Sequence, residues 1–138
     1  MTLLDAYALI AFLIGGPAAP QVRAILREGD TAVATVNLIE VLDVADRVHG
    51  LPIARSMEVL EPLLDGHVTA ISLDSAFAQR AAEIRAKHYH RSSCQISLAD
   101  AVLLATAKPR DRIATADLDV LAVARSEGLE VVALVQRS

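Results

Sequence analysis

Five acidic residues of this sequence lie in or next to apolar segments, where an unpaired carboxylate is energetically unfavourable. Each comes either soon after a short apolar segment or inside an apolar helix. They are Asp5, Glu40, Asp100, Asp117 and Asp119. Carboxylates that converge without Lys or Arg partners repel one another and raise one another's pKa values. A divalent cation removes that repulsion, and oxygen ligands without His or Cys favour Mg2+ or Mn2+ over zinc. A site of this kind supports hydrolysis of a phosphodiester.

Asp100 is the most informative of the five. Residues 98–105 predict a helix with almost no solvent-exposed face, because only Asp100 interrupts a run of Leu, Ala and Val. An ionised carboxylate in such a helix is costly unless it is paired or bound to a metal.

Each acid also has a purely structural interpretation. Asp5 and Asp117 can cap the helices that follow them, and Ser97 with Asp100 matches a capping box. Asp119 can interact with a helix dipole, and Glu40 can be an ordinary solvated residue. Independent capping does not explain why the acids recur at segments that a parallel sheet would bring to one edge.

The segments that position these acids alternate between strands and helices. We expect strands at residues 2–4, 32–35, 68–71, 113–115 and 131–134. We expect helices at residues 6–14, 20–27, 36–49, 52–64, 75–87, 98–107 and 118–127. This alternation predicts an α/β fold: a single domain with a mostly parallel open sheet of four to five strands, flanked by helices on both faces. Ligands of such folds bind beyond the carboxyl ends of the strands.

Length and composition agree with one packed domain over residues 1–138. The apolar share is 54% and the charged share 22%, so apolar burial can offset the loss of conformational entropy. A net charge of -4 is the wrong sign for holding nucleic acid by bulk electrostatics, and 3% aromatic content disfavours stacking platforms. The single cysteine, Cys94, suits a reducing compartment. Without a basic leader or a run of about 20 apolar residues, we expect a cytoplasmic protein with no membrane segment.

The motifs that carry the acids resemble those of the PIN-domain ribonucleases, and most closely the VapC toxins of type II toxin-antitoxin pairs. The resemblance extends over essentially the whole chain and rests on four stretches in order: Leu3-Leu4-Asp5-Ala6, Thr35-Val36-Asn37-Leu38-Ile39-Glu40, Ser97-Leu98-Ala99-Asp100-Ala101 and Thr115-Ala116-Asp117-Leu118-Asp119. It implies Mg2+-dependent endoribonuclease activity on structured RNA, homodimerisation and a cognate VapB-like antitoxin.

The resemblance also implies roles for individual residues. Asp5, Asp100 and Asp117 would hold the metal, with Asp119 as a further ligand. Glu40 would position or deprotonate the attacking water, and Thr115 would orient a carboxylate or a water molecule. Tyr7 and Val120 depart from the family pattern, which bears on substrate fit more than on the chemistry.

A basic segment without acids lies between Glu83 and Asp100 and is our predicted contact surface for RNA. Its candidate contacts, together with one from a second basic patch expected near Asp117, are Arg85, Lys87, Tyr89, Arg91 and Arg112. The alternative is a solvated helix end whose basic side chains interact favourably with the helix dipole. A zinc site at His88, His90 and Cys94 would lack a clear fourth ligand.

The competing functional hypothesis is a catalytically silent scaffold of the same fold that binds RNA or a protein. A receiver-type phosphorylation module, a haloacid-dehalogenase phosphatase and a dinucleotide-binding oxidoreductase fit less well. Tyr7 stands where the phosphatase needs a second Asp, and Gly15-Gly16 comes one helix too late for a phosphate-binding turn. The apolar stripe of Ile53, Met57, Leu60 and Leu64 is expected to pack in the core. Part of it, or of the helix of residues 6–14, is the alternative candidate surface for the dimer or an antitoxin groove.

Overall fold

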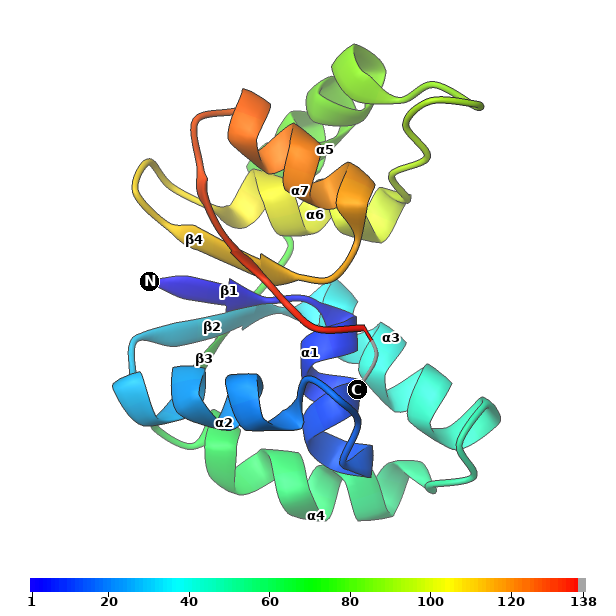
Figure 1. Ribbon diagram of the computed structural model, residues 1–138, viewed down its shortest axis with the longest axis vertical. Coiled ribbons are helices and arrows are strands. Elements are labelled where there is room, and N and C mark those ends of the chain that lie inside the picture. The colour runs from blue at the N-terminus through cyan, green and yellow to red at the C-terminus, as the bar shows by residue number, and fades with distance from the viewer. Residues whose placement is uncertain (137–138) are drawn as a thin grey trace.

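The computed structural model describes residues 1–136, which form five strands and seven helices in alternation (Figure 1). The strands are β1 Thr2–Leu4, β2 Thr31–Ala34, β3 Val68–Ile71, β4 Arg112–Thr115 and β5 Glu130–Ala133. The helices are α1 Ala6–Ile14, α2 Ala19–Glu28, α3 Thr35–Arg47, α4 Ile53–Leu64, α5 Ser75–His88, α6 Leu98–Thr106 and α7 Leu118–Ser126. Every expected element is present, and the ends differ from the expected ones by no more than about two residues.

The five strands form one sheet in the order β3-β2-β1-β4-β5, and all four pairings are parallel. The predicted open parallel sheet is therefore confirmed. The chain winds outward from β1 to β3 on one side and then returns to place β4 on the other side of β1. In open α/β sheets such a reversal leaves a crevice beyond the carboxyl ends of the two central strands. Here the reversal falls between β1 and β4; Asp5 follows β1 directly, and Asp117 comes two residues after β4.

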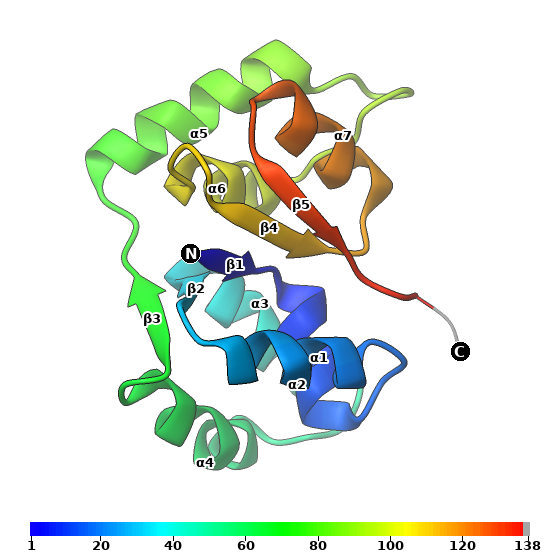
Figure 2. The same cartoon turned by 60° about the vertical axis from the view of Figure 1, so that its left-hand side comes forward.

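Helices cover both faces of the sheet, as Figures 1 and 2 show. On one face, Leu3 and Ile113 are fully buried against α5, α6 and α7. On the other face, Leu4, Val33 and Ala114 are fully buried against α1, α2 and α4. The sheet is covered on both sides because residues of opposite orientation along each strand are apolar, which is typical of a parallel sheet.

The helices of residues 1–136 are too short or too polar to cross a bilayer singly. Only α1 and α2 taken together reach the length and apolar character required, and they meet at an angle of 108°.

Candidate active site

The predicted acidic residues converge at the carboxyl edge of the sheet. A cavity of about 240 Å³ opens there. Its lining comes from the junction of β1 with α1, from α3 and α6, from the link between β4 and α7, and from the segment after β5. The lining residues are Asp5, Ala6, Tyr7, Glu40, Asp100, Ala116, Asp117 and Gln136. Four of the five predicted acids thus share one cavity, although Asp5 and Asp117 lie near opposite ends of the sequence.

Asp5 is the most buried of these acids, with 8% of its surface exposed. It lies between β1 and α1, and its Oδ1 accepts a hydrogen bond of 2.9 Å from Ala8 N, which caps the helix. Burial raises the pKa of Asp5 from 3.8 to about 7, against the lowering effect of hydrogen bonds from Thr115 and Ala8. The charges of Asp100 and Glu40 raise this pKa further. A carboxyl group in this setting is held near neutral unless a cation compensates its charge.

Asp117 immediately precedes α7 and caps it. Its Oδ1 accepts hydrogen bonds from Asp119 N at 2.8 Å and Val120 N at 3.1 Å. Its own amide donates to the hydroxyl of Thr115, 3.1 Å away, and Thr115 is fully buried. Since the Thr115 hydroxyl also acts on the Asp5 carboxyl, this residue couples the two acids that follow the central strands. The predicted supporting residue thus bonds the backbone of Asp117 and lowers the pKa of Asp5.

Asp100 completes a capping box at the start of α6. Its Oδ2 accepts from Ser97 N at 2.9 Å, while its amide donates to Ser97 Oγ at 3.0 Å. Burial is the main reason that the pKa of Asp100 is raised; the Ser97 hydrogen bonds oppose this shift, and the charges of Asp117 and Asp119 add to it.

The capping interpretations of these acids are correct, and they do not compete with a site. Asp5, Asp100 and Asp117 each accept the capping hydrogen bonds through a single oxygen. A carboxylate has two oxygens and about four lone-pair directions, so a capping acid retains capacity for a ligand. Capping fixes the position of each carboxylate at the edge of the cavity.

Glu40 reaches the cavity from α3 and is held by a residue that sequence reasoning missed. Asn37 is 1% exposed, and its Nδ2 lies 3.1 Å from Glu40 Oε1 and 3.5 Å from the carbonyl oxygen of Ala99. Burial raises the pKa of Glu40, the hydrogen bond from Asn37 lowers it, and the charge of Asp100 raises it. A polar residue one helical turn before the acid, on the buried face of the helix, is the signal that could have identified Asn37.

One wall of the cavity comes from the segment after β5, which crosses near the start of α1 (Figure 1). Tyr7 donates its phenol hydrogen to the carbonyl oxygen of Val135, and Gln21 accepts from Val135 N at 2.8 Å. Gln136 Nε2 donates to the carbonyl oxygen of Ala116 at 3.1 Å. Tyr7, which departs from the family pattern, is thus used to fix this wall. Gln136 was not predicted, because no sequence motif marks it.

The donors that line the cavity fit a hard divalent cation. The lining has four carboxylates and no Lys, Arg or His, and oxygen ligands are the preference of Mg2+. Among residues 1–136, no three His, Cys, Asp or Glu side chains are grouped so that they could hold one ion as they stand. Mg2+ does not require such a cage, because it usually keeps several waters and takes one or two carboxylates from the protein. The lack of such a group among residues 1–136 also gives no support to a zinc site at His88, His90 and Cys94.

The predicted RNA contacts do not all reach this cavity. Arg112 begins β4, so it lies at the amino edge of the sheet, where it donates to Thr2 Oγ1 and pairs with Glu28 at 3.1 Å. The predicted second basic patch near Asp117 is therefore wrong, because one strand length separates the two edges. Lys87 pairs with Glu127 at 3.1 Å, at the end of α7 remote from Asp117.

The remaining predicted contacts lie at the end of α5 and in the segment that follows it. Arg85 Nε donates to the carbonyl oxygen of Ile96 at 3.1 Å, and its guanidinium lies 4.3 Å from the centre of the Tyr89 ring. Tyr89 and Arg91 are exposed. Asp119 is absent from the cavity lining, and its Oδ2 accepts a hydrogen bond of 3.0 Å from Gln95 N.

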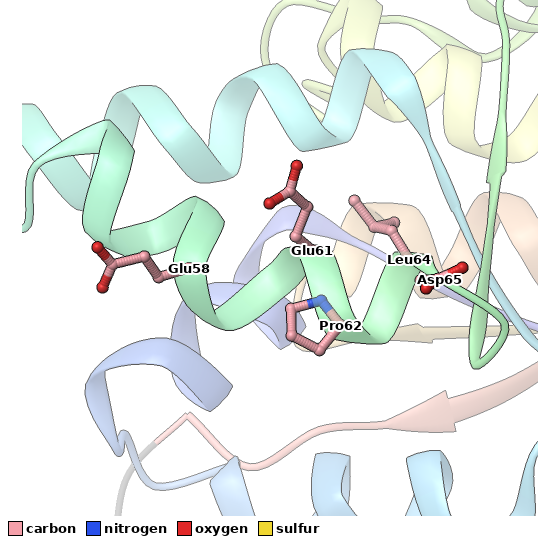
Figure 3. A pocket seen from close by; sticks show the side chains of 5 residues that line it. All are labelled: Glu58, Glu61, Pro62, Leu64 and Asp65. Atoms are coloured by element: carbon pink, nitrogen blue, oxygen red, sulfur yellow. The ribbon is translucent and has the colours of Figure 1, made fainter.

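A larger hollow, of about 830 Å³, lies along α4 (Figure 3). Glu58, Glu61 and Asp65 line it together with Pro62 and Leu64, and Figure 3 shows the carboxylates of Glu58 and Glu61 extending in different directions. All five residues come from one helix and its end, so they border an open surface instead of converging. Size alone does not make this hollow the functional site.

The fold and the cavity together define an α/β domain with an acidic site at the reversal point of a parallel sheet. The family model for the PIN domain matches residues 2–126. The chain belongs to the PIN domain family, as its four motifs predicted.

Several solved structures are similar to this chain over nearly their whole length. A toxin-antitoxin complex from Klebsiella pneumoniae is 22% identical, with a TM-score of 0.67, covering 94% of this chain and 95% of that chain. DNA-bound VapBC from Salmonella typhimurium is 18% identical, with a TM-score of 0.69 and 96% of each chain covered. FitAcB from Neisseria gonorrhoeae is 25% identical, with a TM-score of 0.62, covering 95% of this chain and 96% of that chain. No curated protein shows significant similarity to the sequence.

Proposed function

We propose that this protein is a metal-dependent endoribonuclease and the toxin of a type II toxin-antitoxin pair. The observation that carries the proposal is the convergence of Asp5, Glu40, Asp100 and Asp117 on one cavity whose lining has no cationic side chain. PIN domains are generally nucleases, and the similar structures are of toxin-antitoxin complexes.

Asp5, Asp100 and Asp117 are the residues that would hold Mg2+, directly or through water, and Mn2+ is the alternative ion. When bound, the ion would compensate the carboxylate charges and the charge that develops on the phosphate. Thr115, through its buried hydroxyl, would hold Asp5 and Asp117 in fixed positions relative to each other.

Glu40 would orient the attacking water and accept its proton, because it is the cavity acid held in place by a buried amide donor. The water oxygen forms the new bond to phosphorus while the bond from phosphorus to the 3' oxygen breaks. The 3' oxygen leaves and takes up a proton, so the products carry a 5'-phosphate and a 3'-hydroxyl.

The direct test is cleavage of total cellular RNA by the purified protein in EDTA, Mg2+ or Mn2+, with mapping of new 5' ends. The Asp100→Asn variant runs beside it, and Asp46→Asn is the matched control, because Asp46 is an exposed acid on α3 outside the cavity. Discrete cuts that require a metal and vanish only in Asp100→Asn would support the nuclease. RNA binding without cleavage under any metal would favour the silent scaffold instead.

A groove between α1, α2 and α4 is the proposed docking site for the antitoxin. It has a volume of about 460 Å³, an apolar lining of Phe12, Leu26 and Leu63, and a basic rim of Arg23, Arg27 and His67. These features suit an amphipathic helix whose apolar face enters the groove and whose flanks are acidic.

We also propose that the protein forms a homodimer through apolar residues close to the cavity. Ile39, Leu98 and Leu118 are 66%, 68% and 78% exposed, and each lies near the start of a helix that carries or follows a site acid. Exposed apolar side chains that form one patch mark an interaction surface, and the proposal is that these three do so. Leu118→Glu should convert a dimer to a monomer in light scattering, and a wild-type monomer at all concentrations would contradict this proposal.

A further inference from the structure

The carboxylate of Asp119 faces the basic segment and not the cavity. Its Oδ2 accepts a hydrogen bond of 3.0 Å from the backbone amide of Gln95. Asp119 is half-buried in the first turn of α7 and does not belong to the cavity lining. A charge-assisted hydrogen bond to a backbone amide is among the stronger local restraints on a loop.

Residues 89–95 link the end of α5 to the start of α6, and two contacts with opposite ends of α7 flank this segment. At the carboxyl end of α7, Glu127 pairs with Lys87 at 3.1 Å, just before the segment begins. At the amino end of α7, Asp119 accepts the hydrogen bond from Gln95, where the segment ends. The chain then continues directly into the Ser97 cap and the helix that carries Asp100.

The segment between these ties is an ordered turn, which we name the basic turn (residues 89–95). His90 and Cys94 exchange backbone hydrogen bonds of 2.7 and 3.0 Å, and Gln95 Nε2 donates to the carbonyl oxygen of Arg91. Tyr89 and Arg91 remain exposed on it. The turn therefore presents an aromatic ring and a guanidinium from a fixed backbone.

We propose that Asp119 is a positioning residue that docks the basic turn beside the acidic cavity, so that Arg91 and Tyr89 can hold the RNA strand entering it. The proposal rests on the endoribonuclease function above and replaces a metal-binding role for Asp119. A protein of net charge -4 needs cations held close to its acidic site to retain a polyanion. Arg91 supplies a phosphate contact, and Tyr89 supplies a face on which a base stacks.

The test compares Asp119→Asn, which keeps an oxygen acceptor, with Asp119→Ala, which removes it. Asp46→Ala is the matched control for loss of an exposed acid on α3. Three quantities are measured: hydrogen exchange of the Gln95 amide by NMR, binding of a labelled RNA hairpin in EDTA, and the Mg2+ concentration that gives half-maximal cleavage.

Docking by Asp119 predicts that Gln95 exchange quickens and RNA binding weakens, each by about 10-fold, in Asp119→Ala. Asp46→Ala should stay near the wild type in both, while Asp119→Asn should lie between the wild type and Asp119→Ala, because a neutral oxygen accepts a weaker hydrogen bond than a carboxylate. All three variants should require the same Mg2+ concentration. Equal Gln95 exchange in the wild type and Asp119→Ala would overturn the proposal. So would a large rise in the Mg2+ requirement of Asp119→Asn, because a ligand role depends on the charge that Asn lacks. Wild-type protein that cuts no RNA would contradict the proposed function, while exchange and binding in EDTA would still decide the role of Asp119.

Discussion

Asn37 donates a hydrogen bond from Nδ2 to Glu40 Oε1 across 3.1 Å, from a position that is 1% exposed. The same nitrogen lies 3.5 Å from the carbonyl oxygen of Ala99, one residue before Asp100. Asn37 Oδ1 is buried and has no hydrogen-bond partner among residues 1–136. The amide therefore fixes the acid on α3 relative to the helix that carries Asp100.

Asn37→Ala should lower kcat for RNA cleavage by about 10-fold and leave KM nearly unchanged, because Glu40 loses its fixed orientation while the RNA contacts remain. The free energy of unfolding should fall by about 1 to 2 kcal/mol in the same variant, since a buried hydrogen bond is lost. Steady-state kinetics and urea unfolding measure the two effects. A fall in stability with unchanged kcat would assign Asn37 to packing alone.

Glu40→Gln should reduce kcat by about 100-fold or more, because the amide cannot accept a proton from water. Gln keeps the size of Glu and an oxygen for Asn37 Nδ2, so circular dichroism and the unfolding midpoint should change little. Asp43→Asn, which affects an exposed acid on α3 that pairs with Arg47, should cleave like the wild type. Equal rates for Glu40→Gln and Asp43→Asn would remove Glu40 from the proposed mechanism.

The stability of the metal-free protein should depend on the protonation of Asp5. Burial raises the pKa of this carboxyl from 3.8 to about 7, so between these pH values the folded protein holds a proton that the unfolded chain releases. The free energy of unfolding must then fall as pH rises from about 4 to about 7. Asp5→Asn should be more stable than the wild type at pH 8 by up to about 4 kcal/mol, at about 1.4 kcal/mol for each of roughly three pKa units, and similar to it near pH 4.

Thermal unfolding in EDTA across this pH range checks the Asp5 prediction. Mg2+ added at pH 8 should raise the Tm of the wild type and leave that of Asp5→Asn nearly constant, because a ligand stabilises only the form that it binds. If wild-type stability increased steadily between pH 5 and pH 7, the Asp5 carboxyl would not dominate the pH dependence of the free energy of unfolding.

Charge reversal on the rim of the α1, α2 and α4 groove should weaken antitoxin binding selectively. Arg23→Glu with Arg27→Glu should lower the association rate by about 10-fold at low salt, with a smaller effect at high salt, since rim charges mainly steer association. RNA cleavage should be unaffected, because neither residue lines the acidic cavity. Binding kinetics against the purified antitoxin measure the effect, and an unchanged rate would place the docking surface elsewhere.

The positions of the strands and helices could be predicted because hydrophobic periodicity and helix caps are local signals. Asp5, Ser97 and Asp117 mark helix starts in the sequence and do so in the structure. The convergence of the acids could be predicted as well, since the carboxyl ends of parallel strands share an edge.

The error at Arg112 came from treating nearness in sequence to Asp117 as nearness in space. A strand separates the two residues and places them at opposite edges of the sheet. Asn37, Gln95 and Gln136 were missed for a related reason: their roles depend on a single hydrogen bond or on a segment that returns from a distant part of the chain. Composition and spacing carry no information on such contacts.

The strand order has a consequence for synthesis of the protein on the ribosome. β1 lies between β2 and β4, so the site around Asp5 is incomplete until β4, which begins at Arg112, has been synthesised. The cavity also needs Gln136, which forms part of its wall. An N-terminal part of the chain can pair β1, β2 and β3, yet it has neither Asp117 nor the cavity. A nascent chain that has emerged only as far as β3 therefore lacks the complete cavity, and the acidic site can form only after Asp117 and Gln136 have followed.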